Sequence, residues 1–93
     1  MILEQAQLDV IAGRELEFEA AFAEARSIIE SVPGFLGLRL LRGIESPSRY
    51  LLLVEWETLE SHTIGFRESD GYQQWRRLLH HFYDPFPMVQ HFA

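Results

Sequence analysis

One apolar stretch decides the fold: residues 49–57, which have the sequence RYLLLVEWE. Side chains of an extended strand alternate between its two faces. One face would carry Tyr50, Leu52, Val54 and Trp56. The opposite face carries Leu51 and Leu53, so it is largely apolar as well. The pattern predicts a central strand that is covered on both sides.

Two strands and a long helix are predicted before this stretch. Polar and apolar residues alternate over residues 4–10, which indicates a strand. Apolar residues then recur every three or four positions over residues 14–31, which predicts an amphipathic helix. Pro33-Gly34 ends that helix, and a strand over residues 35–44 follows. We expect one face of this strand to carry Leu36, Leu38 and Leu40.

A helix in two parts and a short strand are predicted after the central stretch. Thr58 and Ser69 are suitable N-cap residues for the two parts. The first part would turn Leu59, His62, Thr63 and Phe66 inward, and the second would turn Tyr72, Trp75, Leu79 and Phe82 inward. Two prolines within residues 84–87 end the helical pattern, and residues 88–92 alternate as a final strand.

The predicted order of elements is β-α-β-β-α-β, with the second helix broken in two. This order is that of an α+β, ferredoxin-like domain, a split β-α-β sandwich with a four-stranded antiparallel sheet. Helices cover one face of such a sheet, and the short polar turn at residues 45–48 favours a hairpin. The doubly apolar strand at residues 49–57 needs a cover on its second face. We therefore expect a homodimer in which two sheets face each other.

Composition limits the classes of protein that the chain can represent. Its 93 residues indicate one domain, residues 1–93. A formal net charge of −6 disfavours nucleic acid and anionic membranes as partners. The chain has no cysteine, and we find neither a signal peptide nor an apolar run that would span a membrane. We therefore expect a cytoplasmic location.

Three short motifs resemble those of a known family. VPGF at residues 32–35, VEWE at residues 54–57 and FRES at residues 66–69 are similar to segments of the antibiotic biosynthesis monooxygenase (ABM) family. The resemblance extends over nearly the whole chain. It implies a dimeric α+β barrel. Among characterised relatives it implies either oxygenation of aromatic polyketides without metal or organic cofactor, or oxidative breakdown of haem.

The resemblance carries over only in part at the level of single residues. Trp56 matches a tryptophan that lines the pocket of the polyketide-oxidising members, and Arg76 falls where they place an arginine. His62 and Leu52 stand where those members carry a tyrosine and an asparagine. Ala6 stands where the haem-degrading members carry an asparagine, and their axial histidine aligns near Arg76. This departure disfavours haem degradation by that mechanism.

His62 is the candidate catalytic residue. It lies on the apolar stripe between Leu59 and Phe66, so we expect it to point inward, where a neutral imidazole can accept a proton. A deprotonated phenol or enol can reduce oxygen by itself, so such a protein needs no flavin or metal. The alternative is a histidine with a structural role only.

Aromatic and basic residues around His62 are the candidate substrate-binding residues. Trp56, Tyr72 and Trp75 could line a flat aromatic cavity, and Arg76 could pair with a phenolate or carboxylate. Ordinary core packing is the alternative interpretation of the aromatic residues. The sequence contains no glycine-rich nucleotide or phosphate motif, so we expect no cofactor.

We also expect no metal. His80 and His81 are adjacent, so on a helix they point about 100° apart and cannot share one ion. A site that also used His62 and His91 would require a coincidence of folding.

Two hypotheses follow from the sequence. The first is a cofactor-independent monooxygenase that oxidises a small aromatic, polyketide- or quinol-like compound with O2. The second is a non-catalytic dimeric module of the same fold, which binds a small molecule or serves only as structure. An open cavity around His62 would favour the first hypothesis and a filled one the second.

Overall fold

The computed structural model describes residues 1–93 and has the predicted order of elements. The strands and helices are β1 (Ile2–Asp9), α1 (Glu15–Glu30), β2 (Phe35–Arg42), β3 (Arg49–Trp56), the π-helix η1 (Ser61–Phe66), α2 (Asp70–Leu79), the 3-10 helix η2 (His80–Phe82) and β4 (Val89–Phe92). No helix has both the length and the apolar character needed to cross a bilayer.

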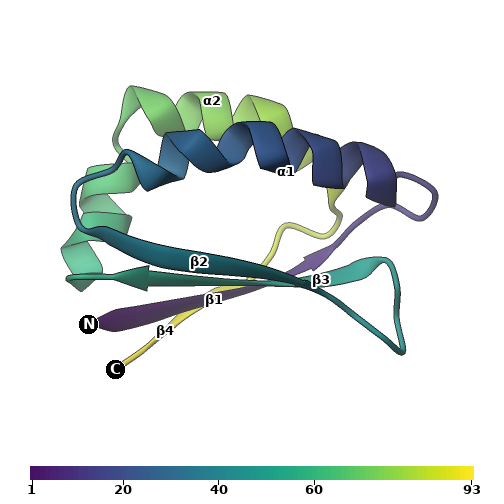
Figure 1. Cartoon of the computed structure of the whole chain (residues 1–93), viewed down its shortest axis with the longest axis horizontal. Coiled ribbons are helices and arrows are strands. Elements are labelled where there is room, and N and C mark those ends of the chain that lie inside the picture. The colour runs from purple at the N-terminus through teal and green to yellow at the C-terminus, as the bar shows by residue number, and fades with distance from the viewer.

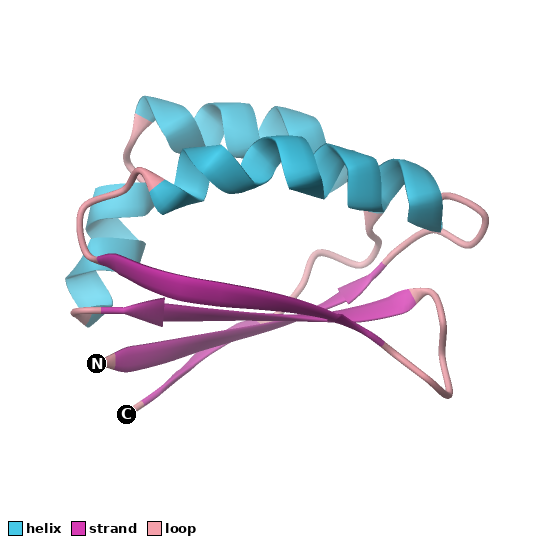
Figure 2. Ribbon diagram, viewed as in Figure 1, coloured by secondary structure: helices cyan, strands magenta, loops and turns pink.

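The structure has two layers (Figures 1 and 2). Helices α1 and α2 pack against each other over one face of the sheet, and the opposite face of the sheet has no cover within the chain. The π-helix η1 lies at one end of this sandwich and connects β3 to α2. It therefore closes the space between the layers at that end.

The sheet has the strand order β2-β3-β1-β4, and all neighbouring strands pair antiparallel. This topology confirms the predicted α+β, ferredoxin-like fold with a split β-α-β arrangement. Strand β3 lies in the interior of the sheet, as its apolar pattern predicts, whereas the short β4 is an edge strand.

The core forms where the alternating strand faces meet the helices. Tyr50, Leu52, Val54 and Trp56 of β3 are at most 4% exposed, as predicted. They pack with inward residues of α1, among them Phe18 and Ile29. The face with Leu51 and Leu53 is only half-buried in the isolated chain. The second cover predicted for β3 would therefore have to come from outside the chain.

The prediction for Leu36 is wrong. The pairing of β2 with β3 is irregular between Phe35 and Gly37, where one residue of β2 has no partner. Such a bulge reverses the alternation at that point. Phe35 therefore packs against Trp56 at a ring-centroid distance of 5.9 Å, while Leu36 is 51% exposed.

The structure corrects the prediction for Leu59, which lies in the two helical residues that precede the π-helix η1. The hydroxyl of Thr58 accepts a hydrogen bond of 3.1 Å from the Ser61 N–H, as expected of a cap at the start of these two residues. Only His62 and Phe66 of the predicted inward stripe are buried, and Leu59 is 41% exposed. Ser61 also packs on Gly34, where any side chain would collide with its hydroxyl. This contact holds η1 beside the turn that follows α1.

Candidate active site

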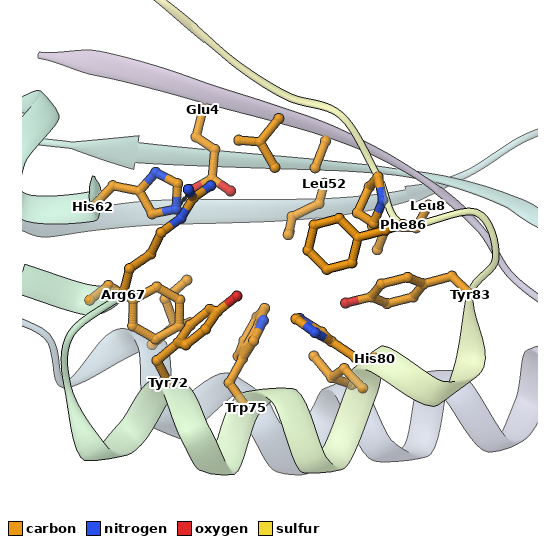
Figure 3. Close-up of a pocket in the computed structure, with 16 residues that line it drawn as sticks. Glu4, Leu8, Leu52, His62, Arg67, Tyr72, Trp75, His80, Tyr83 and Phe86 are labelled. Atoms are coloured by element: carbon orange, nitrogen blue, oxygen red, sulfur yellow. Dashed lines mark ion pairs between the residues drawn. The ribbon is translucent and has the colours of Figure 1, made fainter. Parts of the chain in front are cut away.

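A cavity lies between the sheet and α2, beside η1 (Figure 3). It is small, about 50 Å³. Most of its wall is apolar, with Leu52 and Ala6 from the sheet, and Phe66 and Trp75 from the helical layer. The polar or charged side chains in the wall are Glu4, His62, Arg67, Tyr72, His80 and Tyr83.

A buried carboxyl and a buried imidazole meet at one end of this cavity. Glu4 is 5% exposed and His62 is 3% exposed. Glu4 lies on β1 and accepts a hydrogen bond of 2.9 Å from the indole N–H of Trp56. Nε2 of His62 lies 3.4 Å from the same carboxyl oxygen, and the ring of His62 stacks on that of Trp56 with 5.4 Å between centroids. Trp56 thus positions both groups.

His91 joins this pair from the edge strand β4. Nδ1 of His62 and Nε2 of His91 are 2.8 Å apart, which is a hydrogen bond with one nitrogen as donor. The strand register makes His91 the direct neighbour of Glu4. The structure therefore brings together two histidines whose meeting the sequence does not indicate. No group of three or more His, Cys, Asp or Glu side chains is arranged to hold a metal ion.

The environment shifts the proton affinities of all three groups. Burial raises the pKa of Glu4, and the Trp56 hydrogen bond and the charge of Arg67 offset part of this rise. Burial lowers the pKa of His62 to about 3, together with the positive charge of Arg67 and the repulsion from His91 when that ring is protonated. The pKa of His91 is also lowered, by burial and by Arg67. The imidazoles are therefore neutral at pH 7, and the carboxyl is a stronger base than an exposed one.

Arg67 reaches the cavity because η1 is a π-helix. The N–H of Arg67 donates to the carbonyl oxygen of His62, five residues earlier, at 3.2 Å. In an α-helix these two residues would point about 140° apart. The wider turn instead brings Arg67 close to His62, and its side chain extends toward Glu4 (Figure 3). The sequence indicated a helix here but gave no signal of this type of turn.

Two hydroxyls and another imidazole face the rest of the cavity. Tyr72, His80 and Tyr83 point into the cavity from α2 and the segment after it (Figure 3). Burial and the neighbouring Tyr72 raise the pKa of Tyr83, so its hydroxyl stays protonated and can donate a hydrogen bond. The cavity therefore offers polar partners at both ends and apolar contacts between them.

The structure brings three of the five predicted site residues to the cavity and leaves two outside it. His62, Tyr72 and Trp75 line the wall. Trp56 lies behind His62 and does not line the wall. Arg76 is exposed on the outer side of α2, because it follows the inward-facing Trp75 and points about 100° away from it.

Comparison with known sequences identifies relatives along the chain. Residues 1–78 match the model of the family described as antibiotic biosynthesis monooxygenase. The uncharacterized protein YczJ of Bacillus subtilis is 52% identical over 92 residues, which cover 99% of this chain and 97% of YczJ. A heme oxygenase (mycobilin-producing) of Mycobacterium tuberculosis is 39% identical over 54 residues, which cover 58% of this chain and 51% of that protein.

Comparison with solved structures gives the same fold. The structure of a proposed antibiotic biosynthesis monooxygenase from Bordetella bronchiseptica matches with a TM-score of 0.95 and 41% identity, over 99% of this chain and 94% of that one. SnoaB, a cofactor-independent oxygenase from Streptomyces nogalater, matches with a TM-score of 0.82 and 21% identity, over 99% of this chain and 90% of that one. The likeness to SnoaB concerns the fold alone. Together the matches confirm the resemblance that the motifs indicated.

The lowered pKa of His62 predicts a stability that falls in acid. An ordinary histidine, as in the unfolded chain, has a pKa of 6.5, so between pH 6.5 and about 3 the unfolded chain binds the additional proton. The stability that comes from neutral His62 is complete above pH 6.5 and is lost as the pH falls toward 3. Glu4 has the opposite effect, because a raised carboxyl pKa stabilises the fold at low pH.

Urea unfolding at pH 7 and pH 5 tests this prediction. We expect the wild type to lose about 2 kcal/mol more free energy of unfolding between these pH values than His62→Gln loses. Glu4 is present in both proteins, so its contribution cancels in the comparison. Equal losses in the two proteins would show that His62 titrates normally in the folded state.

Proposed function

The chain belongs to the antibiotic biosynthesis monooxygenase family, and on that premise we propose that it oxidises a small, electron-rich aromatic compound, of the polyketide or quinol kind, with O2. The observation that carries the proposal is the pair of buried groups, Glu4 and His62, at one end of an otherwise apolar cavity. Such a pair can remove a proton from a substrate that water cannot reach.

The reaction balances without an external reductant. The pair removes a proton from an activated CH2 group of the substrate, and the resulting carbanion reduces O2 to a peroxide bonded to that carbon. The peroxide takes up a proton, its O–O bond breaks, and the carbon loses its second hydrogen. A carbonyl and one water result, because the CH2 group supplies all four electrons that O2 takes up.

The wall of the cavity suits a flat compound with oxygen atoms at both ends. Phe66, Trp75 and Leu52 offer apolar surface to an aromatic ring. Arg67 favours an anion beside His62, and its charge would stabilise the deprotonated substrate. The hydroxyl of Tyr83 would bind an oxygen at the far end, and that of Tyr72 points into the cavity nearer to Arg67 (Figure 3).

The small volume favours a second candidate, a non-catalytic module of the same fold. Pockets that bind small organic molecules measure roughly 300–1,000 Å³, whereas this cavity measures about 50 Å³.

An aromatic ring therefore enters this cavity only after a side chain of the wall moves. Phe86 is suited to this movement, because it lies outside the helices and strands and is 67% exposed, yet contacts the cavity residue His80 at 5.3 Å between ring centroids.

We also propose that the protein is a homodimer, whichever of the two functions it has. The open face of the sheet carries a group of apolar side chains: Leu3, Leu41, Leu51, Leu53 and Phe92. Leu41 and Phe92 are 37% and 48% exposed. A second sheet packed on this face would bury the group and supply the cover that β3 lacks.

Oxygen uptake tests the oxygenase. We expect the wild type to consume O2 with at least one compound from a panel of anthrones and hydroquinones, and ¹⁸O2 to leave one labelled oxygen in the product. His62→Gln should lower kcat at least about 100-fold, because it breaks the Glu4–His62 pair but keeps a polar side chain. His81→Gln, at an exposed histidine, is the matched control. An unchanged kcat in His62→Gln would show that His62 takes no part in the reaction.

Phe86→Ala tests whether this ring limits access to the cavity. The ring is largely exposed, so its loss should change the stability by less than about 1 kcal/mol. We expect KM for the larger anthrones to fall while kcat stays within about twofold. Met88→Ala, at another exposed apolar residue of the same segment, is the control. An oxygenase whose KM is unchanged by Phe86→Ala would have a different route of entry.

Sedimentation tests the homodimer. We expect the wild type to be a dimer at micromolar concentration and Leu53→Glu to be a monomer, because the added charge would be buried between the sheets. Leu16→Glu, on the exposed side of α1 with 77% exposure, should remain a dimer. A monomeric wild type would contradict the proposal.

A further inference from the structure

We propose that Glu4, His62 and His91 form a proton relay between the cavity and the solvent beside the edge strand β4. Its role in turnover rests on the proposed function, whereas its existence as a hydrogen-bonded chain can be tested without any substrate.

The relay has one member on each of three elements. Glu4 lies on β1, His62 on η1 and His91 on β4. Glu4 and His62 line the cavity, and His91 does not. His91 is only half-buried, on a strand that has no neighbour on its outer side. The three side chains therefore lead from an enclosed site to the edge of the molecule.

The distances connect the three groups in series. The carboxyl oxygen of Glu4 lies 3.4 Å from Nε2 of His62. The other nitrogen of His62, Nδ1, lies 2.8 Å from Nε2 of His91. Each imidazole can accept a proton at one nitrogen while it releases one from the other. A proton can therefore enter each histidine at one nitrogen and leave it at the other.

Two arrangements of protons satisfy these contacts. In the first, Glu4 is ionised, Nε2–H of His62 donates to it, and Nε2–H of His91 donates to Nδ1 of His62. In the second, Glu4 is protonated and donates to Nε2 of His62, whose Nδ1–H donates to Nε2 of His91. The conversion of the first into the second takes one proton from water at Nδ1 of His91 and delivers one to Glu4. The reverse conversion carries one proton out.

The electrostatics favour a relay over a histidine that holds the proton. Burial and the charge of Arg67 lower the pKa values of both His62 and His91, so an imidazolium is costly at either position. Both imidazoles are neutral in each of the two arrangements, so a concerted transfer between these arrangements avoids that ion. Besides Arg67, the titratable groups that face the cavity from the helical side are Tyr72, His80 and Tyr83.

One turnover of the proposed reaction uses the relay in both directions. Turnover begins with Glu4 ionised and the hydrogens of both imidazoles on Nδ1. Uptake of the substrate's proton by Glu4 gives the second arrangement, and an outward transfer then gives the first, in which the carboxylate is restored. Protonation of the peroxide requires an inward transfer through the same groups. The second transfer restores the starting tautomers, so neither ring has to rotate between turnovers.

Nitrogen NMR tests the relay without a substrate. In the wild type with ¹⁵N-labelled histidine, we expect a scalar coupling between Nδ1 of His62 and Nε2 of His91 through their shared hydrogen. As the carboxyl of Glu4 becomes protonated on acidification, the hydrogen of His62 should move from Nε2 to Nδ1. Absence of the coupling, or tautomers that ignore the state of Glu4, would overturn the relay whatever the protein catalyses.

Kinetics on a substrate that the wild type oxidises provide the second test. Gln at position 91 can still donate a hydrogen bond to His62, but it cannot pass a proton on. We expect His91→Gln to lower kcat at least about tenfold with KM unchanged, and to increase the solvent isotope effect. His91→Ala should regain rate when imidazole is added, which a loss of structure would not allow.

The remaining outcomes separate the relay from the proposed function. A wild-type kcat in His91→Gln would overturn the relay even if the oxygenase is confirmed. His81→Gln, an exposed histidine outside the chain of contacts, controls for the loss of an imidazole. If the wild type oxidises no compound of the panel, the proposed function fails, and the NMR result alone decides the relay.

Discussion

The structure depends on a carboxyl buried between the sheet and the helices. A carboxyl removed from water is costly unless hydrogen bonds replace its hydration. Glu4 is 5% exposed, and the indole N–H of Trp56 supplies one such bond. The need to bond this carboxyl constrains the register of β1 against β3 and against β4, and it constrains the position of η1 over the sheet. A shift of register by one residue would turn Glu4 to the open face and leave Trp56 and His62 without their partner.

Much of the fold could be predicted because alternation and helical periodicity are local properties. The face of β3 that carries Tyr50, Leu52, Val54 and Trp56 is buried as its pattern predicts, and the hydroxyls of Thr58 and Ser69 accept the hydrogen bonds expected of caps. The errors occur where the backbone departs from regular geometry. The bulge in β2 exposes Leu36, and the π-turn of η1 brings Arg67 to the cavity.

The site was harder to predict, because its polar groups come from distant parts of the chain. His62 lies on an apolar helical stripe, which predicts its inward direction. Glu4 shares a strand face with Ala6 and Leu8, so the same alternation already placed a carboxyl on the buried side. His91 meets His62 only because β4 pairs with β1, and no local pattern indicates that register.

The buried polar groups of this small protein argue that the cavity has a function. Glu4 and His62 are the two buried residues that are polar or charged, and they contact each other at the same cavity. Apolar residues of similar volume at both positions would often give an equal or greater stability. Stability therefore does not explain the pair, whereas proton transfer requires such groups in a place that water does not fill. The half-buried His91 strengthens this argument, because it connects the enclosed pair to the edge of the molecule.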